Sequence, residues 1–122
     1  MNNEDYAQMQ MLDYQIKQIQ QVLENIDQQL VELSHTKDAL MELLTLKGDE
    51  ETLFPIANGI FVKGRLTDNK IVRMNIGANI VVEKSVQDAI VMMDKQYKDI
   101  DEYKHQLMKQ LESSTQKLEG MQ

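Results

Sequence analysis

The chain has 122 residues, which is enough for one ordinary domain, and it carries one Pro, no Cys and no Trp. The absence of cysteine excludes a disulfide framework and thiolate chemistry. A net charge of −7 without a basic face disfavours binding to nucleic acid or to an anionic membrane surface. No apolar run is long enough to cross a bilayer and the acidic N-terminus is not a signal peptide, so we expect a cytoplasmic protein.

Residues 1–48 have the pattern of one long coiled-coil helix. Alternating steps of three and four residues from Met9 to Leu44 meet an apolar side chain at every position except Lys37. The mean step of about 3.5 residues is that of a coiled-coil seam. The pair Lys47-Gly48 predicts a basic last turn and a glycine stop.

Residues 49–84 contain the single Pro and most of the Gly, and they predict four short strands in two hairpins. Asn58-Gly59 is a strong signal for a two-residue hairpin turn, and Gly77-Ala78-Asn79 predicts the second turn. The predicted strands cover residues 53–57, 60–66, 71–76 and 80–83.

Residues 85–122 repeat the heptad pattern, and nine of eleven seam positions from Val86 to Met121 are apolar. Ser85 followed three residues later by Asp88 forms the start of a capping box, which predicts the N-terminus of this helix.

Two such helices joined by a compact insert must run antiparallel. Because both helices rise by the same distance per residue, the numbers of two residues that lie opposite each other sum to about 130. This register places Ile26 near residue 104 and Leu12 near Leu118, and it brings both ends of the chain together at one tip. Two helices of an ordinary bundle are the alternative interpretation, although bundle helices usually have a wider apolar stripe.

Three polar residues interrupt the seams, namely Lys37, Lys104 and Ser114. Polar seam residues commonly fix the register of a coiled coil at some cost in stability. A local loosening that lets the coil flex is the alternative.

The predicted hairpins cannot be stable by themselves, because an isolated hairpin is marginal in water and its edges are open to pairing. One coiled coil covers little of such a surface, so we expect the strands to pack against other chains. The candidate interface residues are Ile60, Val62, Ile71, Met74, Ile80 and Val82. The predicted fold is α+β: one domain over residues 1–122, with an antiparallel two-helix coiled coil joined by two β-hairpins that assemble into an oligomeric platform.

The signals for catalysis or metal binding are weak. Gly59–Leu66 nearly matches a phosphate-binding loop, but Arg65 replaces the lysine, Leu66 replaces the hydroxyl and no helix follows. His35 and His105 lie too far apart in the predicted register to share a metal ion. We therefore expect no catalytic residues, no metal and no cofactor.

The predicted tip, where the two chain ends converge, carries apolar side chains with few partners in their own hairpin. Methionine is flexible and polarizable, so it can repack against varied apolar surfaces. Ordinary coil filler is the alternative interpretation. The candidate binding residues at the tip are Tyr6, Met9, Met11, Leu12, Leu118 and Met121.

Two heptad helices flanking two hairpins resemble an alpha-type, archaeal-like subunit of the prefoldin family, since beta-type subunits carry one hairpin. Leu53–Gly64 resembles the family stretch in which a hydrophobic residue and Pro precede a strand ending near Gly. Asn75–Lys84 resembles its V-G-x-G-hydrophobic-E-K/R stretch. The chain departs from the family at Asn58 or Asn79, where members often carry glycine, and many members have a longer C-terminal tail.

The resemblance implies an ATP-independent holdase that grips unfolded client proteins with its coiled-coil tips and delivers them to a group II chaperonin. It also implies a hexamer of two alpha-type and four beta-type subunits, with no nucleic acid, membrane or nucleotide involved. Two other functions stay open on the residues alone. One is a scaffold or adaptor that docks a single specific partner, and the other is an enzyme, for which the strands offer no convergent catalytic set.

Overall fold

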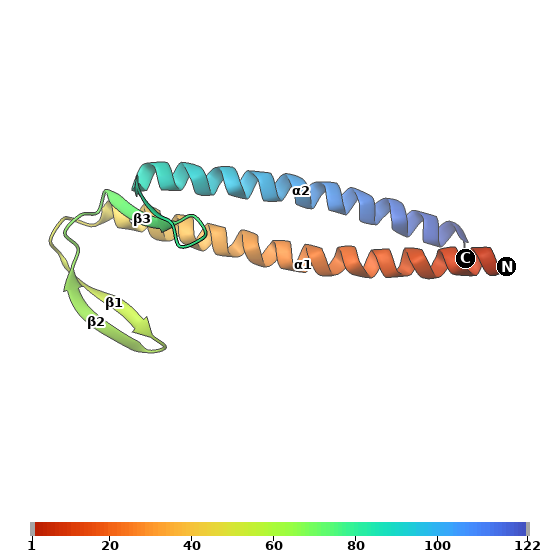
Figure 1. Cartoon of the computed structure of the whole chain (residues 1–122), viewed down its shortest axis with the longest axis horizontal. Helices are drawn as coiled ribbons and strands as arrows, with labels where there is room; N and C mark the ends of the chain where they lie inside the picture. Colours follow the sequence, from red (N-terminus) through yellow and green to blue (C-terminus); the bar gives the residue numbers. More distant parts are fainter. Residues whose placement is uncertain (1, 122) are drawn as a thin grey trace. The chain divides into compact units, whose positions relative to one another are not determined.

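The computed structural model describes residues 2–121. The elements follow in the predicted order, with each strand boundary within two residues of its predicted position. They are α1 (Asn3–Thr45), β1 (Glu51–Ala57), β2 (Ile60–Arg65), β3 (Ile71–Asn75), β4 (Val81–Ser85) and α2 (Val86–Met121), as drawn in Figure 1. Two long helices with two antiparallel hairpins between them confirm the predicted fold class.

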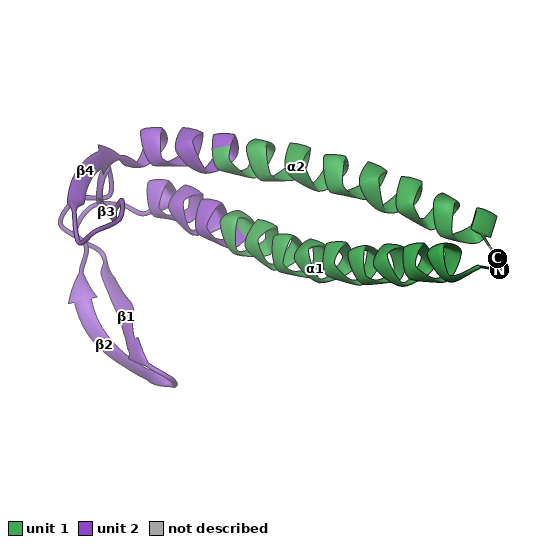
Figure 2. Cartoon of the chain, turned by 45° about the vertical axis from the view of Figure 1, so that its right-hand side comes forward, with its two compact units in different colours: residues 1–34, 96–122 green, residues 35–95 purple. Residues whose placement is uncertain are grey.

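The chain divides into two compact units, coloured separately in Figure 2. Unit 1 contains residues 1–34 and 96–122, and unit 2 contains residues 35–95. No helix within residues 2–121 is both long and apolar enough to cross a membrane.

In unit 1 the first part of α1 and the last part of α2 run antiparallel, side by side (Figures 1 and 2). The predicted seam supplies its most buried side chains, which are Ile19, Ile26, Leu30 and Ser114. The Nζ atom of Lys104 lies 2.8 Å from Oδ1 of Asp27, the neighbour of Ile26, so the predicted register holds here.

In unit 2 the end of α1 and the start of α2 form the second buried cluster. Val86 and Ala89 are fully buried and Met93 is nearly so. The α2 helix begins as predicted, because the Asp88 amide donates a hydrogen bond of 3.0 Å to the Ser85 hydroxyl oxygen. The amide of Val86 donates to the Lys70 carbonyl at 2.8 Å and ties this helix start to the strand segment.

The predicted end of the first helix is wrong. The α1 helix ends at Thr45, so Lys47 and Gly48 lie beyond it, and the positive φ of 70° belongs to Asp49. The side-chain amide of Asn69 donates a 2.6 Å hydrogen bond to the Leu46 carbonyl, one of the groups that a helix end leaves without an intrahelical partner.

The first hairpin pairs β1 with β2 through Phe54 opposite Val62 and Ala57 opposite Ile60, with an irregularity at Ile56. Gly59 has a φ of 74°, whereas Asn58 is not among the residues with positive φ. The turn is therefore not the type I′ turn that Asn-Gly favours, which needs positive φ at both residues.

The second hairpin pairs β3 with β4, with Met74 opposite Val82. Its turn has three successive residues with positive φ, namely Gly77 (116°), Ala78 (49°) and Asn79 (61°). The amide of Gly77 donates to the side-chain oxygen of Asn75 at 2.9 Å, which fixes the entry to the turn.

Candidate functional site

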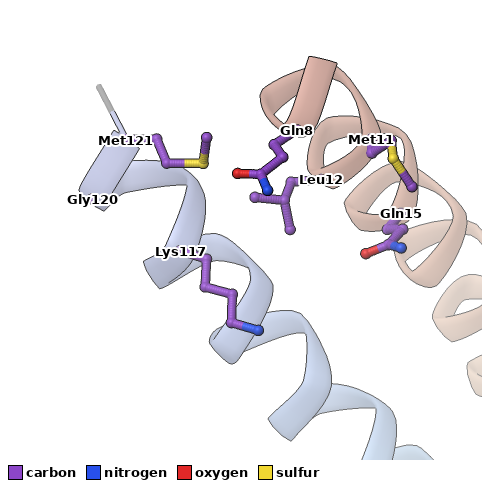
Figure 3. Close-up of a pocket in the computed structure, with 7 residues that line it drawn as sticks. All are labelled: Gln8, Met11, Leu12, Gln15, Lys117, Gly120 and Met121. Atoms are coloured by element: carbon purple, nitrogen blue, oxygen red, sulfur yellow. The ribbon is translucent and has the colours of Figure 1, made fainter. Parts of the chain in front are cut away.

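The N-terminal end of α1 and the C-terminal end of α2 enclose a hollow in unit 1, which we call the tip groove (Figure 3). Figure 3 shows Gln8 and Leu12 of α1 and Met121 of α2 directed toward one another. The lining residues are Gln8, Met11, Leu12, Gln15, Lys117, Gly120 and Met121.

The α1 side of the groove is formed by residues that the helix places on one face. Gln8, Leu12 and Gln15 are separated by four and three residues, so they lie on one face of the helix. The helix is capped six residues before Gln8, where the Asp5 amide donates a 2.8 Å hydrogen bond to the side-chain oxygen of Asn2. The α1 side of the groove therefore lies within the helix and not at its first residues.

The groove brings together three of the six residues predicted at the tip, namely Met11, Leu12 and Met121. Met11 is 63% exposed, and Leu12 and Met121 are half-buried. The other three, Tyr6, Met9 and Leu118, do not line the groove, and Tyr6 is exposed on α1.

Sequence reasoning missed the polar lining, which consists of Gln8, Gln15 and Lys117. The spacing of the two glutamines around Leu12 was the available signal. It was overlooked because a search for apolar side chains treats every glutamine of a coiled coil as part of its solvated face.

The groove has the chemistry of a binding surface. Thioether and aliphatic groups from Met11, Leu12 and Met121 form its apolar part. The amides of Gln8 and Gln15 can donate and accept hydrogen bonds, while the Lys117 ammonium can only donate. Such a lining can hold an extended apolar segment and hydrogen-bond its backbone.

The two seam lysines form ion pairs between the helices. In unit 2, Lys37 Nζ lies 2.7 Å from Asp94 Oδ1, and in unit 1 Lys104 pairs with Asp27 at 2.8 Å. In each pair the hydrogen bond to the aspartate, followed by its charge, raises the pKa of the lysine above 10.5. These contacts favour the interpretation that the seam lysines fix the register.

The strands leave apolar side chains uncovered, and we call these the hairpin surface. On β1 and β2 the exposed side chains occur on both faces, since Phe54 and Val62 share one face and Leu53 and Phe61 lie on the other. The hairpin surface comprises Leu53, Phe54, Ile56, Ile60, Phe61, Val62, Ile71, Ile80 and Val81.

Four of the six predicted interface residues belong to the hairpin surface, namely Ile60, Val62, Ile71 and Ile80. The other two, Met74 and Val82, lie opposite each other in the second hairpin and are half-buried. Their role in an interface stays a prediction.

The sequence model of the family described as "Prefoldin subunit" matches residues 12–122. The chain belongs to the prefoldin family. Prefoldins are chaperones with a two-helix coiled-coil architecture, and their alpha subunits form oligomers with other prefoldin subunits, so a role in protein folding fits this chain.

Two archaeal prefoldins illustrate the similarity. A protein named prefoldin subunit alpha from Methanococcus aeolicus is 31% identical over 119 residues, covering 98% of this chain and 81% of the relative. A protein named prefoldin subunit alpha 1 from Methanocaldococcus jannaschii is 30% identical over 110 residues, covering 89% and 77%.

A solved structure has the same fold. A chain from the cryo-electron microscopy structure of the filamentous prefoldin of Methanocaldococcus jannaschii superposes with a TM-score of 0.82, covering 99% of this chain and 97% of that one. The two sequences are 18% identical, so this likeness concerns the fold alone.

The structure places residues from both weak signals for enzyme chemistry. Gly59–Leu66 comprises a turn residue, strand β2 and the residue after it. His105 Nδ1 lies 2.7 Å from the Asp101 carbonyl oxygen on the same helix. No group of three potential metal ligands occurs within residues 2–121.

Proposed function

We propose that this prefoldin is an ATP-independent holdase subunit that binds non-native proteins in the tip groove. The observation that carries the proposal is the groove, which is lined by the apolar side chains of Met11, Leu12 and Met121 together with polar side chains. Flexible thioethers repack against different apolar partners, so the groove suits clients of unrelated sequence.

The expected strength of the grip is modest for each contact. A side chain of this size contributes about 1.5–3 kcal/mol when it is fully buried. Met11 is 63% exposed in the free chain, so a client has apolar surface left to cover. A few such contacts from several subunits hold an unfolded chain and still release it.

The proposal includes partners. The hairpin surface, apolar on both faces of β1 and β2, supports assembly with beta-type prefoldin subunits, in the hexamer of two alpha-type and four beta-type subunits expected from the family. One prefoldin-like domain over residues 1–122, delivery of clients to a group II chaperonin and a cytoplasmic location complete the proposal.

The test compares polar substitutions of exposed methionines inside and outside the groove. The double variant Met11→Ser/Met121→Ser removes two apolar groove groups, whereas Met41→Ser changes a methionine that is 50% exposed on α1 in unit 2. Each full chain is assembled with beta-type subunits and mixed with several unrelated unfolded proteins without ATP, and aggregation is followed by light scattering.

We expect the double variant to need about tenfold more chaperone for equal protection, corresponding to about 1.4 kcal/mol. Met41→Ser should protect as the wild type does. Equal protection by the double variant and the wild type would contradict the proposed binding surface. Protection of a single client among several would support the adaptor function instead.

A further inference from the structure

The chain has nine methionines and no cysteine, so all of its oxidisable sulfur is thioether. Susceptibility to oxidation follows the exposure of the sulfur. Met93 is 7% exposed on the buried seam of unit 2 and is shielded from solvent, whereas Met11 is 63% exposed. Peroxide should therefore oxidise Met11 faster than Met93.

Within residues 2–121, Met11 and Met121 are the methionines that line the tip groove (Figure 3). Met11 comes from α1 and Met121 from α2, so each helix contributes one thioether to the groove. Met11 lies off the predicted seam and Met121 is its last, half-buried position, so neither is among the buried residues Ile19, Ile26 and Leu30 of unit 1.

We propose that Met11 and Met121 are a methionine-oxidation site through which a hydroperoxide weakens client binding and a sulfoxide reductase restores it. The inference rests on the proposed function of the tip groove and adds its regulation.

The reaction balances with a hydroperoxide as the oxidant. A lone pair on the thioether sulfur attacks the hydroxyl oxygen of the hydroperoxide and forms an S–O bond. The O–O bond breaks, its electron pair goes to the departing oxygen, and the proton of the attacked hydroxyl passes to that oxygen. The sulfur loses two electrons and becomes a sulfoxide, while the hydroperoxide is reduced to an alcohol, or to water if it is hydrogen peroxide. Methionine sulfoxide reductases reverse the change.

The polar lining of the groove can hydrogen-bond the sulfoxide oxygen that oxidation adds. A sulfoxide is polar and accepts hydrogen bonds, and the same groove contains donors on Gln8, Gln15 and Lys117. Oxidation therefore replaces apolar contact surface by a polar, hydrogen-bonded and hydrated surface. A client's apolar segment loses its contacts there, while the buried residues Ile19, Ile26 and Leu30 keep their packing.

The test uses the full chain assembled with beta-type subunits and treated with hydrogen peroxide. Peptide mass spectrometry measures oxidation at each methionine, and protection of an unfolded client is measured before and after treatment. The variant Met11→Leu/Met121→Leu keeps apolar side chains of similar volume but has no sulfur in the groove. Met41→Leu removes a thioether that is 50% exposed on α1 in unit 2, outside the groove. Each variant is compared with its own untreated sample.

We expect peroxide to oxidise Met11 and Met121 before Met93 and to weaken protection by the wild type and by Met41→Leu about tenfold. Protection by Met11→Leu/Met121→Leu should change less than twofold on treatment, and sulfoxide reductase should restore the wild type. The inference is overturned if Met11 and Met121 stay reduced, or if the leucine variant loses as much protection as the wild type. An untreated assembly that protects no client overturns the proposed function, whereas unchanged protection after oxidation overturns this inference alone.

Discussion

The ring of Phe54 lies over Gly64 in the first hairpin, and this contact explains the glycine. A Cβ atom on Gly64 would lie 2.7 Å from Phe54 Cε2 and 2.9 Å from Cδ2, closer than real Cβ contacts. The backbone of Gly64 does not have a positive φ, so space and not conformation requires the missing side chain. Glycine within a strand often marks such a close approach.

Substitution of Gly64 by Ala should displace the Phe54 ring and destabilise the hairpin. The effect should depend on the ring, so Gly64→Ala should be milder or neutral in a Phe54→Ala background. We expect the two changes to be coupled by about 0.5–3 kcal/mol, the range for residues in contact. Chemical denaturation of the wild type, both single variants and the double variant measures this coupling. Additive effects would show that the ring does not constrain position 64.

At the scale of elements, the sequence predicted the helices and turns whose signals are repeated or short. The heptad seam located both helices, because burial every three or four residues leaves a pattern that needs no knowledge of the fold. The Ser85 cap and the Asn58-Gly59 turn were found because their signals span only a few residues. The tip residues Met11, Leu12 and Met121 followed from the same register.

The errors arise where distant residues decide the local structure. Gly48 was expected to stop α1, but the helix ends at Thr45, where the Leu46 carbonyl accepts a hydrogen bond from Asn69, 23 residues later. The partners of the seam lysines were not predicted either. The heptad pattern shows that Lys104 is a polar residue at a seam position. Only the structure shows that its side chain pairs with Asp27 on the other helix.

The ion pair between Lys104 and Asp27 should make stability depend on pH in the range where lysine titrates. The hydrogen bond to Asp27, followed by the charge of Asp27, raises the pKa of Lys104 above 10.5, the value for an unperturbed lysine. The stabilisation is thus fully present below pH 10.5 and is lost as the pH rises through the higher pKa of the folded state. The Tm difference between wild type and Asp27→Asn should therefore shrink above that pH.

Thermal unfolding followed by circular dichroism measures this difference at several pH values. Asp13→Asn is the matched control, because Asp13 pairs with Lys17 at 3.0 Å within one helix and not across the seam. Pairs of this kind contribute little, so the control should follow the wild type across the range. A Tm difference for Asp27→Asn that stays constant with pH would show that the ion pair does not account for its effect.

At the scale of the whole molecule, the hairpin surface is the clearest sign that the chain is incomplete by itself. Apolar side chains lie on both faces of β1 and β2, so covering one face would leave the other in water. Large exposed apolar patches mark interaction sites in soluble proteins. The uncovered strands therefore favour an assembly in which neighbouring subunits contact the hairpins on more than one side.

A charge placed on this surface should separate assembly from folding. Val62 is 47% exposed in the chain, so Val62→Asp costs little before assembly but buries an unpaired carboxylate if a neighbouring subunit covers it. Gel filtration should show a smaller species that keeps most of its helical circular dichroism. Val31→Asp is the control, because Val31 is 53% exposed on α1 in unit 1, whereas the hairpins belong to unit 2, and this change should leave the assembly intact. An assembly of unchanged size for Val62→Asp would place the subunit contacts elsewhere than on this face of the hairpin.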